Sequence, residues 1–207
     1  MQWALTHLDD IGWATWEHAV LVSVSVAVAF LISFAVAIWA SRQPRVYPPI
    51  MGITALLYTI PSLALFALLI PLVGLGRVPA IIGLVAYSLL ILIRNIATGL
   101  REVPADVVEA ALGMGMGPWQ LLLTIEMPLA MPVIIAGLRI ATVTVIGIAT
   151  IAAYINAGGL GTLIFTGIAQ DFPAKIVVGA GLASGMAVGA DAGLSRLERR
   201  LRARRAA

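Results

Sequence analysis

Long apolar segments alternate with short polar or basic ones along this chain of 207 residues. A helix that crosses a bilayer needs about 20 mostly apolar residues, so each long segment is a candidate membrane span. The pattern therefore predicts an all-α integral membrane protein with about five transmembrane helices. Their approximate ranges are 18–40, 48–72, 78–98, 128–154 and 174–191.

The polar segments predict three parts, which are an interfacial N-terminal segment 1–17, a transmembrane domain 18–194 with a polar connection at about 99–127, and a basic tail 195–207. Trp3, Trp13 and Trp16 lie among leucines in the first part. This pattern favours an interfacial helix that carries part of an aromatic belt. A cation-binding cage is the alternative interpretation, because aromatic faces also hold quaternary ammonium groups.

Composition supports the membrane assignment and narrows the chemistry. The chain is 61% hydrophobic and 11% charged, with a mean hydropathy of +1.03, which is more apolar than a soluble domain requires. It contains no cysteine, which excludes disulfides, thiol nucleophiles and Cys-ligated metals. Asp9, Asp10 and Glu17 precede the first apolar run, where a cleavable signal would carry basic residues, so no such signal is expected.

The positions of the charges predict the orientation in the membrane. Cytoplasmic loops carry an excess of Lys and Arg, so the more basic side is expected to face the cytoplasm. This places the N-terminus outside, and the 99–127 connection and the tail inside. The basic side holds Arg42, Arg45, Arg101 and the tail arginines 196, 199, 200, 202, 204 and 205; the other side holds Arg77, Lys175, Asp9, Asp10, Glu17 and Asp171. The tail arginines are interpreted as an anchor on anionic lipid, worth ~1 kcal/mol per residue.

Catalysis is not expected in this chain. A P-loop needs Gly-Lys followed by Ser or Thr, whereas Lys175 is the only lysine and is followed by Ile176. His7 and His18 both lie near the N-terminus, which leaves no histidine for a triad or a zinc pair deeper in the membrane. The sequence therefore predicts no catalytic residue, no metal site and no cofactor bound by this chain itself.

Residues 109–128 predict a short helix, a glycine turn and a second helix. Ala110 and Ala111 leave one helix face almost without bulk, so that a partner can approach closely. Gly115 can adopt the left-handed conformation that ends a helix, and Pro118 suits the first turn of the next one. Glu109 is a candidate for a polar contact with the partner. An ordinary loop with a Gly-Met-Gly turn is the alternative. Trp119, Leu122 and Leu123 have the spacing to bury an apolar face.

This stretch resembles the EAA signature of ABC-importer permeases. The pattern is EAA, three residues, Gly, nine residues, Ile, one residue, then Leu-Pro; Met127 replaces its Leu. The resemblance implies a membrane subunit that docks a separate ATPase. The matching positions, to which the resemblance assigns ATPase coupling, are Glu109, Ala110, Ala111, Gly115, Ile125 and Pro128.

Polar and helix-breaking residues within the spans are candidates for the solute pathway, because such groups are costly in lipid. Pro61 interrupts the second span beside Tyr58 and Ser62; it indicates either a discontinuous helix that lines the pathway or a simple kink. The glycine-rich stretch predicts a tight turn or a close backbone approach. Arg139, within the fourth span, is expected to snorkel or to pair with an acid such as Glu102 or Asp106. The candidates are Tyr58, Pro61, Ser62, Asn156, Gly158, Gly159 and Gly161.

Segments 60–65, 70–76 and 157–165 resemble the osmoprotectant branch of these permeases, the importers of glycine betaine, choline and carnitine. The resemblance implies a type I ABC-importer permease fold in a bacterial or archaeal cell membrane. It implies a second permease copy or a paralogue, a cytoplasmic ATPase dimer that binds ATP and Mg²⁺, and an extracytoplasmic solute-binding protein; no nucleic acid is expected. A methionine-type ABC permease is one alternative. An ATP-independent secondary transporter is another, and it would show inverted repeats.

Overall fold

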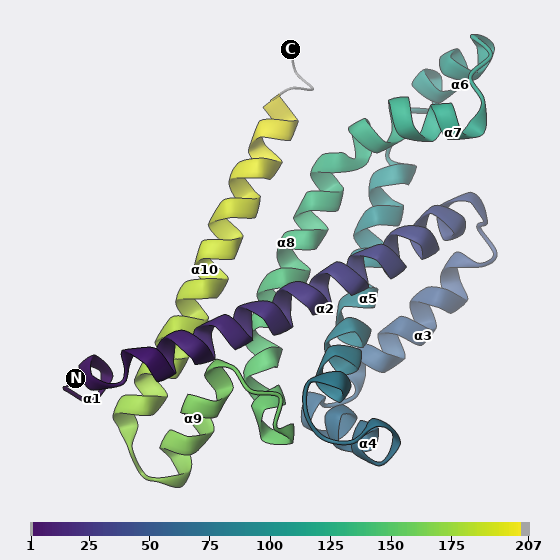
Figure 1. Cartoon of the computed structure of the whole chain (residues 1–207). Coiled ribbons are helices and arrows are strands. Elements are labelled where there is room, and N and C mark those ends of the chain that lie inside the picture. The colour runs from purple at the N-terminus through teal and green to yellow at the C-terminus, as the bar shows by residue number, and fades with distance from the viewer. Residues whose placement is uncertain (1, 204–207) are drawn as a thin grey trace.

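The computed structural model describes residues 2–203, and within this range the chain is helical without strands. Four helices are long and apolar enough to cross a membrane, and a bent pair of shorter helices makes up a fifth span (Figure 1). The expected all-α membrane architecture with about five spans is confirmed. The four long elements are α2 (Leu8–Arg42), α5 (Arg77–Arg101), α8 (Met127–Ala152) and α10 (Pro173–Ala203).

The fifth span, second in the chain, is broken at Pro61. Helices α3 (Tyr47–Thr59) and α4 (Ser62–Val73) meet at an angle of 97°. Proline has no N–H to donate and disfavours helical geometry at the residue before it, and Ile60 is accordingly extended, with ψ of 128°. Of the two sequence interpretations, the structure therefore supports a discontinuous helix over a simple kink.

Shorter elements connect the spans at the two ends of the molecule. They are α1 (Gln2–Thr6), α6 (Ala105–Gly113), α7 (Pro118–Leu121), a π turn (Leu122–Glu126), a 3₁₀ turn (Ala153–Ile155) and α9 (Leu160–Ala169). Figure 1 shows α6, α7 and the end of α10 together at one end, and α1, α4 and α9 at the other. We call the first the 102–126 end and the second the N-terminal end. The arginines near 42, 101 and 196–202 belong to the first, and Arg77 and Lys175 to the second.

Helices α2, α5 and α8 pack around the main apolar core through small residues. The buried face of α2 repeats every four residues as Ser25, Ala29, Ser33 and Ala37, so that neighbouring backbones can approach closely. On α5, a Cβ atom at Gly99 would lie 3.1 Å from the carbonyl oxygen of Ala130 on α8. Other large apolar side chains of the spans, such as Leu31, Leu56 and Val188, are exposed, as expected where lipid is the solvent.

Two helices are longer than the sequence pattern suggested. Helix α2 begins at Leu8, so Trp13 and Trp16 lie on the same helix as the first span, which was expected from residue 18. Helix α10 continues to Ala203 through most of the predicted tail. No proline interrupts either stretch, so the helical hydrogen bonds continue past the end of the apolar run. Arg204 and Arg205 of the predicted tail lie outside the described residues.

Candidate functional site

The segment between α5 and α8, residues 102–126, forms the predicted helix–turn–helix. Helix α6 ends in a Schellman motif, in which the Met116 N–H donates to the Ala111 carbonyl at 3.2 Å and the Gly115 N–H to that of Leu112 at 2.9 Å. Gly115 has φ of +82°, the left-handed conformation expected of it. Pro118 lies in the first turn of α7, also as predicted.

The six signature residues differ in exposure. Glu109 and Ala110 are exposed on α6, whereas Ala111 is buried against the rest of the segment. Gly115 lies open, with no atom within 4 Å of where a Cβ would stand. Ile125 is half-buried in the π turn and Pro128 is exposed at the start of α8. The segment therefore presents Glu109, Ala110 and the glycine turn on its outer surface.

The predicted apolar face of α7 is only partly buried. Leu122 is 3% exposed, but Trp119 and Leu123 are 69% and 64% exposed, so the expectation for these two is wrong within this chain. The helix changes from α to π geometry at Leu122, and the wider π turn no longer keeps residues spaced for an α-helix on one face. Sequence spacing alone could not reveal this change.

Large apolar side chains gather on the outer surface of the 102–126 segment. Leu112, Met114 and Trp119 are all more than half exposed, and they lie on the part of the chain that projects farthest past the spans (Figure 1). Exposed apolar patches outside the spans mark contact sites for partners. Glu109 and Ala110 of the same segment are exposed as well.

Both stems of the 102–126 segment are tied to the end of α2. Before the segment, Arg101 donates to the Ala40 carbonyl at 3.2 Å, and its guanidinium lies 3.9 Å from the centre of the Tyr47 ring. After it, the two carboxylate oxygens of Glu126 accept from the two terminal nitrogens of Arg42, with Nη1–Oε1 at 2.9 Å. Glu126 is 5% exposed. Sequence reasoning missed this residue, although a lone acid in an apolar run is a usable signal.

At the broken span, Tyr87 of α5 holds the chain where Pro61 interrupts it. The Tyr87 hydroxyl donates to the Ile60 carbonyl, and its ring packs edge-on against Tyr58, with centroids 5.9 Å apart. Of the predicted pathway residues here, Tyr58 and Pro61 are exposed and Ser62 is half-buried. The structure thus adds Tyr87 to this group; its partner is 27 residues away, so sequence spacing did not indicate it.

Replacing Tyr87 by phenylalanine is expected to destabilise the broken span. The change keeps the ring against Tyr58 but removes the donor to the Ile60 carbonyl, and leaving such a group unpaired costs about 1–3 kcal/mol. The midpoint of thermal unfolding in detergent should fall. The control is Tyr58→Phe, which alters the same ring pair without touching that bond; equal midpoints for both variants and the wild type would contradict the assignment.

The glycine-rich stretch after α8 folds tightly against the start of α2. Gly158 and Gly159 have φ of +82° and +79°, and the Gly159 N–H donates to Glu17 Oε2 at 3.1 Å. A Cβ on Gly158 would lie 2.6 Å from the same oxygen. Arg77, at the start of α5, donates to the other Glu17 oxygen. The predicted close approach is confirmed, and Glu17 and Arg77 are partners that sequence reasoning did not pair.

The other two predicted pathway residues of this stretch, Asn156 and Gly161, differ in exposure. Asn156 is exposed and left-handed, with φ of +66°. Gly161 is buried in the first turn of α9, where a Cβ would overlap the Thr150 carbonyl oxygen. The Gly76 N–H donates to the Ile155 carbonyl at 2.8 Å, which joins the loop after α4 to this stretch. The break at Pro61 and the glycine-rich stretch therefore belong to the same end of the molecule (Figure 1).

Arg139 pairs with acidic residues, as expected, but these lie on α10, and the suggested partners Glu102 and Asp106 are wrong. Its Nε lies 2.6 Å from Asp191 Oδ1 and its Nη1 3.1 Å from Glu198 Oε2. Arg202 pairs with the same glutamate at 2.8 Å. Helix α10 packs along α8 and brings both acids to Arg139. Sequence position could not predict the partners, because it does not say which spans are neighbours.

The tryptophans near the N-terminus do not form an open cage. Trp13 and Trp16 are each 63% exposed along α2. Trp3 stacks on His7 at 4.9 Å and meets Phe172 edge-on at 5.8 Å, and the Lys175 ammonium lies 5.3 Å from its ring centre. The ring of Trp3 thus already faces a cation of the chain itself. This arrangement favours the anchoring interpretation.

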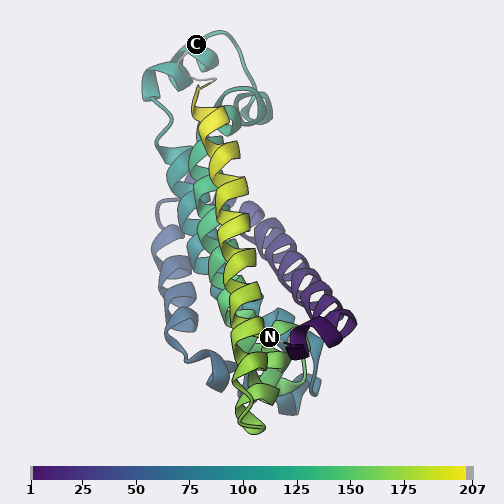
Figure 2. The same cartoon turned by 90° about the vertical axis from the view of Figure 1, so that its left-hand side faces the viewer.

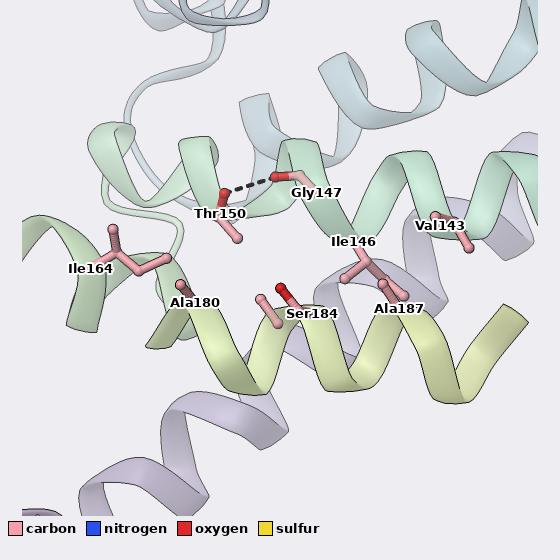
Figure 3. Close-up of a pocket in the computed structure, with 9 residues that line it drawn as sticks. Val143, Ile146, Gly147, Thr150, Ile164, Ala180, Ser184 and Ala187 are labelled. Carbon is pink, nitrogen blue, oxygen red and sulfur yellow. Dashed lines mark hydrogen bonds between the residues drawn. The ribbon is translucent and has the colours of Figure 1, made fainter. Parts of the chain in front are cut away.

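A cavity of about 280 Å³ lies between α8, α9 and α10 (Figure 3). Its polar groups are few: the Thr150 hydroxyl donates to the Gly147 carbonyl at 2.7 Å, and Ser184 contributes a second hydroxyl. None of the predicted pathway residues is among the lining residues, which are Val143, Ile146, Gly147, Thr150, Ile164, Ala180, Ala183, Ser184 and Ala187. Within residues 2–203, no three His, Asp or Glu side chains gather as a metal site would require.

The sequence of residues 29–203 matches the family described as binding-protein-dependent transport system inner membrane component. The chain belongs to this family. As a member it is a multi-pass membrane protein and a transport subunit of the ABC type. This agrees with the architecture, in which most of the matched range consists of spans and the 102–126 segment.

Individual relatives of this inner membrane component cover most of its length. It is 40% identical to the carnitine transport permease protein OpuCB of Listeria monocytogenes, over 90% of this chain and 86% of the relative. It is 37% identical to the choline transport system permease protein OpuBB of Bacillus subtilis, over 97% and 93%. It is 39% identical to the osmoprotectant import permease protein OsmW of Salmonella typhimurium, over 92% and 93%.

The fold of this inner membrane component is that of a type I ABC-importer permease. A chain of the MetNI methionine ABC transporter, solved in inward-facing conformations, superposes with a TM-score of 0.85. The match covers 94% of this chain and 97% of that one at 22% identity. At this identity the likeness shows the fold alone.

Proposed function

We propose that this permease imports a compatible solute of the quaternary ammonium type, such as glycine betaine, choline or carnitine. The names of its relatives, which are 37–40% identical over most of their length, support this solute class. The described spans offer mainly apolar surface along with a few hydroxyls. Such a route suits a solute whose charge is delocalised or internally neutralised.

The surface of the 102–126 segment is the proposed docking site for a cytoplasmic ATPase dimer, which binds ATP and Mg²⁺. The observation that carries this assignment is the patch of Leu112, Met114 and Trp119 on a projection beyond the spans. Glu109, Ala110 and the turn at Gly115 are exposed on the same segment, while Ile125 and Pro128 connect it to α8. ATP-driven movement of the ATPase would enter the permease here.

The proposed orientation places the 102–126 end in the cytoplasm and the N-terminus outside. Its support is the charge distribution, since Arg42, Arg45, Arg101 and the arginines of α10 belong to the 102–126 end. An extracytoplasmic solute-binding protein would then meet the N-terminal end. It would carry most of the selectivity.

The proposed pathway opens alternately to the two sides, between this chain and a second copy or a paralogue. Tyr58, Pro61 and Ser62 are proposed to line it, because the broken span leaves them at least partly accessible. Asn156 of the glycine-rich stretch is proposed to face the outer entrance. Gly158, Gly159 and Gly161 are assigned to the same region as the residues that allow its tight packing.

Reconstitution tests the proposed function directly. The permease is placed in liposomes with the ATPase and the solute-binding protein encoded beside it, and uptake of labelled glycine betaine is measured with and without ATP. We expect ATP-dependent uptake that choline or carnitine reduces and methionine does not. Stimulated ATP hydrolysis without betaine uptake would contradict the solute class alone. Failure of any ATPase to associate would contradict the role of the 102–126 segment.

A further inference from the structure

Helix α2 reaches from one polar cluster to another across the whole molecule. It has 35 residues, which corresponds to about 52 Å at 1.5 Å per residue. Both views show it inclined to the other long helices, from the N-terminal end toward the 102–126 end (Figures 1 and 2). Each of its ends makes charged or polar contacts with a segment that the proposed function sets in motion.

At the 102–126 end, α2 is held by both stems of the docking segment. Arg42 binds the carboxylate of Glu126, and the Ala40 carbonyl accepts from Arg101. Because Glu126 is almost fully buried, loss of its bidentate partner would leave an unpaired buried charge. Displacement of the 102–126 segment therefore displaces the end of α2 with it.

At the N-terminal end, α2 holds the glycine-rich stretch. Glu17 accepts from the Gly159 N–H and from Arg77, while the ring Nε2 of His18 lies 3.1 Å from the Ile146 carbonyl oxygen. His18 is fully buried, and a Cβ on Gly159 would touch its Cα at 3.2 Å. Movement of this part of α2 is therefore transmitted to residues 156–159.

Between these contacts α2 has the composition of a stiff helix. No glycine or proline occurs from residue 13 to residue 43. The other three long helices each contain at least two glycines: α5 at 83 and 99, α8 at 137 and 147, and α10 at five positions. Glycine and proline are the usual sites of helix kinks and soft points.

We propose that α2 is a connecting rod that transmits movement of the 102–126 segment to the glycine-rich stretch at the opposite end. Glu126 and Glu17 are the positioning residues that attach the rod at its two ends. The proposal rests on the proposed function for the identity of the driving partner. The mechanical link itself is a property of this chain, and it is testable without ATPase or solute.

One competing route runs through α8, which begins directly after Glu126 and ends at Ala152, just before the glycine-rich stretch. The other runs through α5, which begins at Arg77 and ends where the 102–126 segment starts. It packs along α2 over much of its length. Loosening α2 alone separates the proposed route from both of these. Leu31 and Ile32 are suitable positions, because they lie near the middle of α2 and are 69% and 43% exposed.

The test uses hydrogen exchange in the full chain in nanodiscs. Glu126→Gln weakens the attachment at one end, and exchange is read in peptides that cover residues 156–159 at the other. Couplings of 1–3 kcal/mol correspond to 5–150-fold, so we expect exchange there to rise at least about fivefold. Unchanged exchange in this variant would overturn the proposal.

The role of α2 as the transmitting helix is tested by introducing Glu126→Gln into a Leu31→Gly/Ile32→Gly variant. The same substitution in a Leu31→Ala/Ile32→Ala variant is the matched control. Each glycine disfavours the helix by about 1 kcal/mol relative to alanine. We expect the effect of Glu126→Gln on residues 156–159 to disappear in the glycine background and to persist in the alanine one. Persistence in both backgrounds would assign transmission to α5 or α8 and overturn the role of α2.

Transport of the same variants gives a second measurement. In proteoliposomes with ATPase and solute-binding protein, the glycine pair is expected to lower solute uptake per ATP hydrolysed at least about fivefold, and the alanine pair to leave it unchanged. If the Leu31→Gly/Ile32→Gly variant takes up as much solute per ATP as the wild type, the proposal that α2 transmits movement is overturned. Absence of ATP-driven uptake in the wild type would instead contradict the proposed function, while the exchange experiment still decides the mechanical link.

Discussion

Replacing Gly115 by valine is expected to abolish the coupling of ATP hydrolysis to uptake while the chain still inserts and folds. Gly115 has φ of +82°. A β-branched residue is strained in this conformation by about 1–3 kcal/mol, so the turn would rearrange and displace α7 from α6. Since about 1.4 kcal/mol is a factor of ten, we expect ATP-driven uptake about 5- to 150-fold lower in proteoliposomes.

Two further variants distinguish the effect of backbone conformation on uptake from the effect of side-chain volume at this turn. Gly115→Asn should retain most uptake, because asparagine tolerates the left-handed conformation. Gly113→Val adds the same volume two residues earlier, where no atom lies within 4 Å and the glycine is helical, and should have a small effect. Membrane insertion is checked by yield and by elution as a single species in detergent. Normal ATP-driven uptake by Gly115→Val would contradict the docking assignment.

Replacing Gly161 by alanine is expected to destabilise the protein strongly, although it adds only one methyl group. The new Cβ would overlap the Thr150 carbonyl oxygen and lie 2.8 Å from the Ala153 Cβ. These neighbours are backbone and a short side chain, which cannot rotate away, so α9 would have to move off α8. Overpacking of this kind costs about 3 kcal/mol.

The measurement is the midpoint of thermal unfolding in detergent. Gly185→Ala on α10 is the matched control, because nothing lies within 4 Å of its Cβ position, and its midpoint should not fall. Unchanged midpoints for both variants would refute the packing role. Gly161→Ala also tests the pathway assignment, since a variant that unfolds normally but transports poorly would place Gly161 in the pathway instead.

Sequence predicted the features that local chemistry determines. The spans followed from the length of the apolar runs, and the turn of the 102–126 segment from Gly115 and Pro118 acting within a few residues. In the second span, Pro61 indicated either a break or a simple kink, and only the structure decided for the break. Its partner Tyr87 was not predicted, because the hydroxyl comes from another span.

The features that sequence reasoning missed depend on neighbours distant in the chain. Glu17 meets Gly159 over 142 residues, and Glu126 meets Arg42 over 84. Periodicity identifies an exposed or buried face but not the helix that covers it. The exposure of Trp119 was missed for a different reason, since the π turn that follows it has no simple sequence signature.

The ion pairs between Arg139 of α8 and the acids of α10 have a consequence for how the chain is inserted during its synthesis. Both acidic partners of Arg139, Asp191 and Glu198, lie on α10, which leaves the ribosome after α8. Until then Arg139 lies in an inserted helix without these counter-charges, a state that is costly in lipid. Arrival of α10 neutralises it. A chain that stops before α10 would therefore keep an unpaired arginine in its membrane-inserted part.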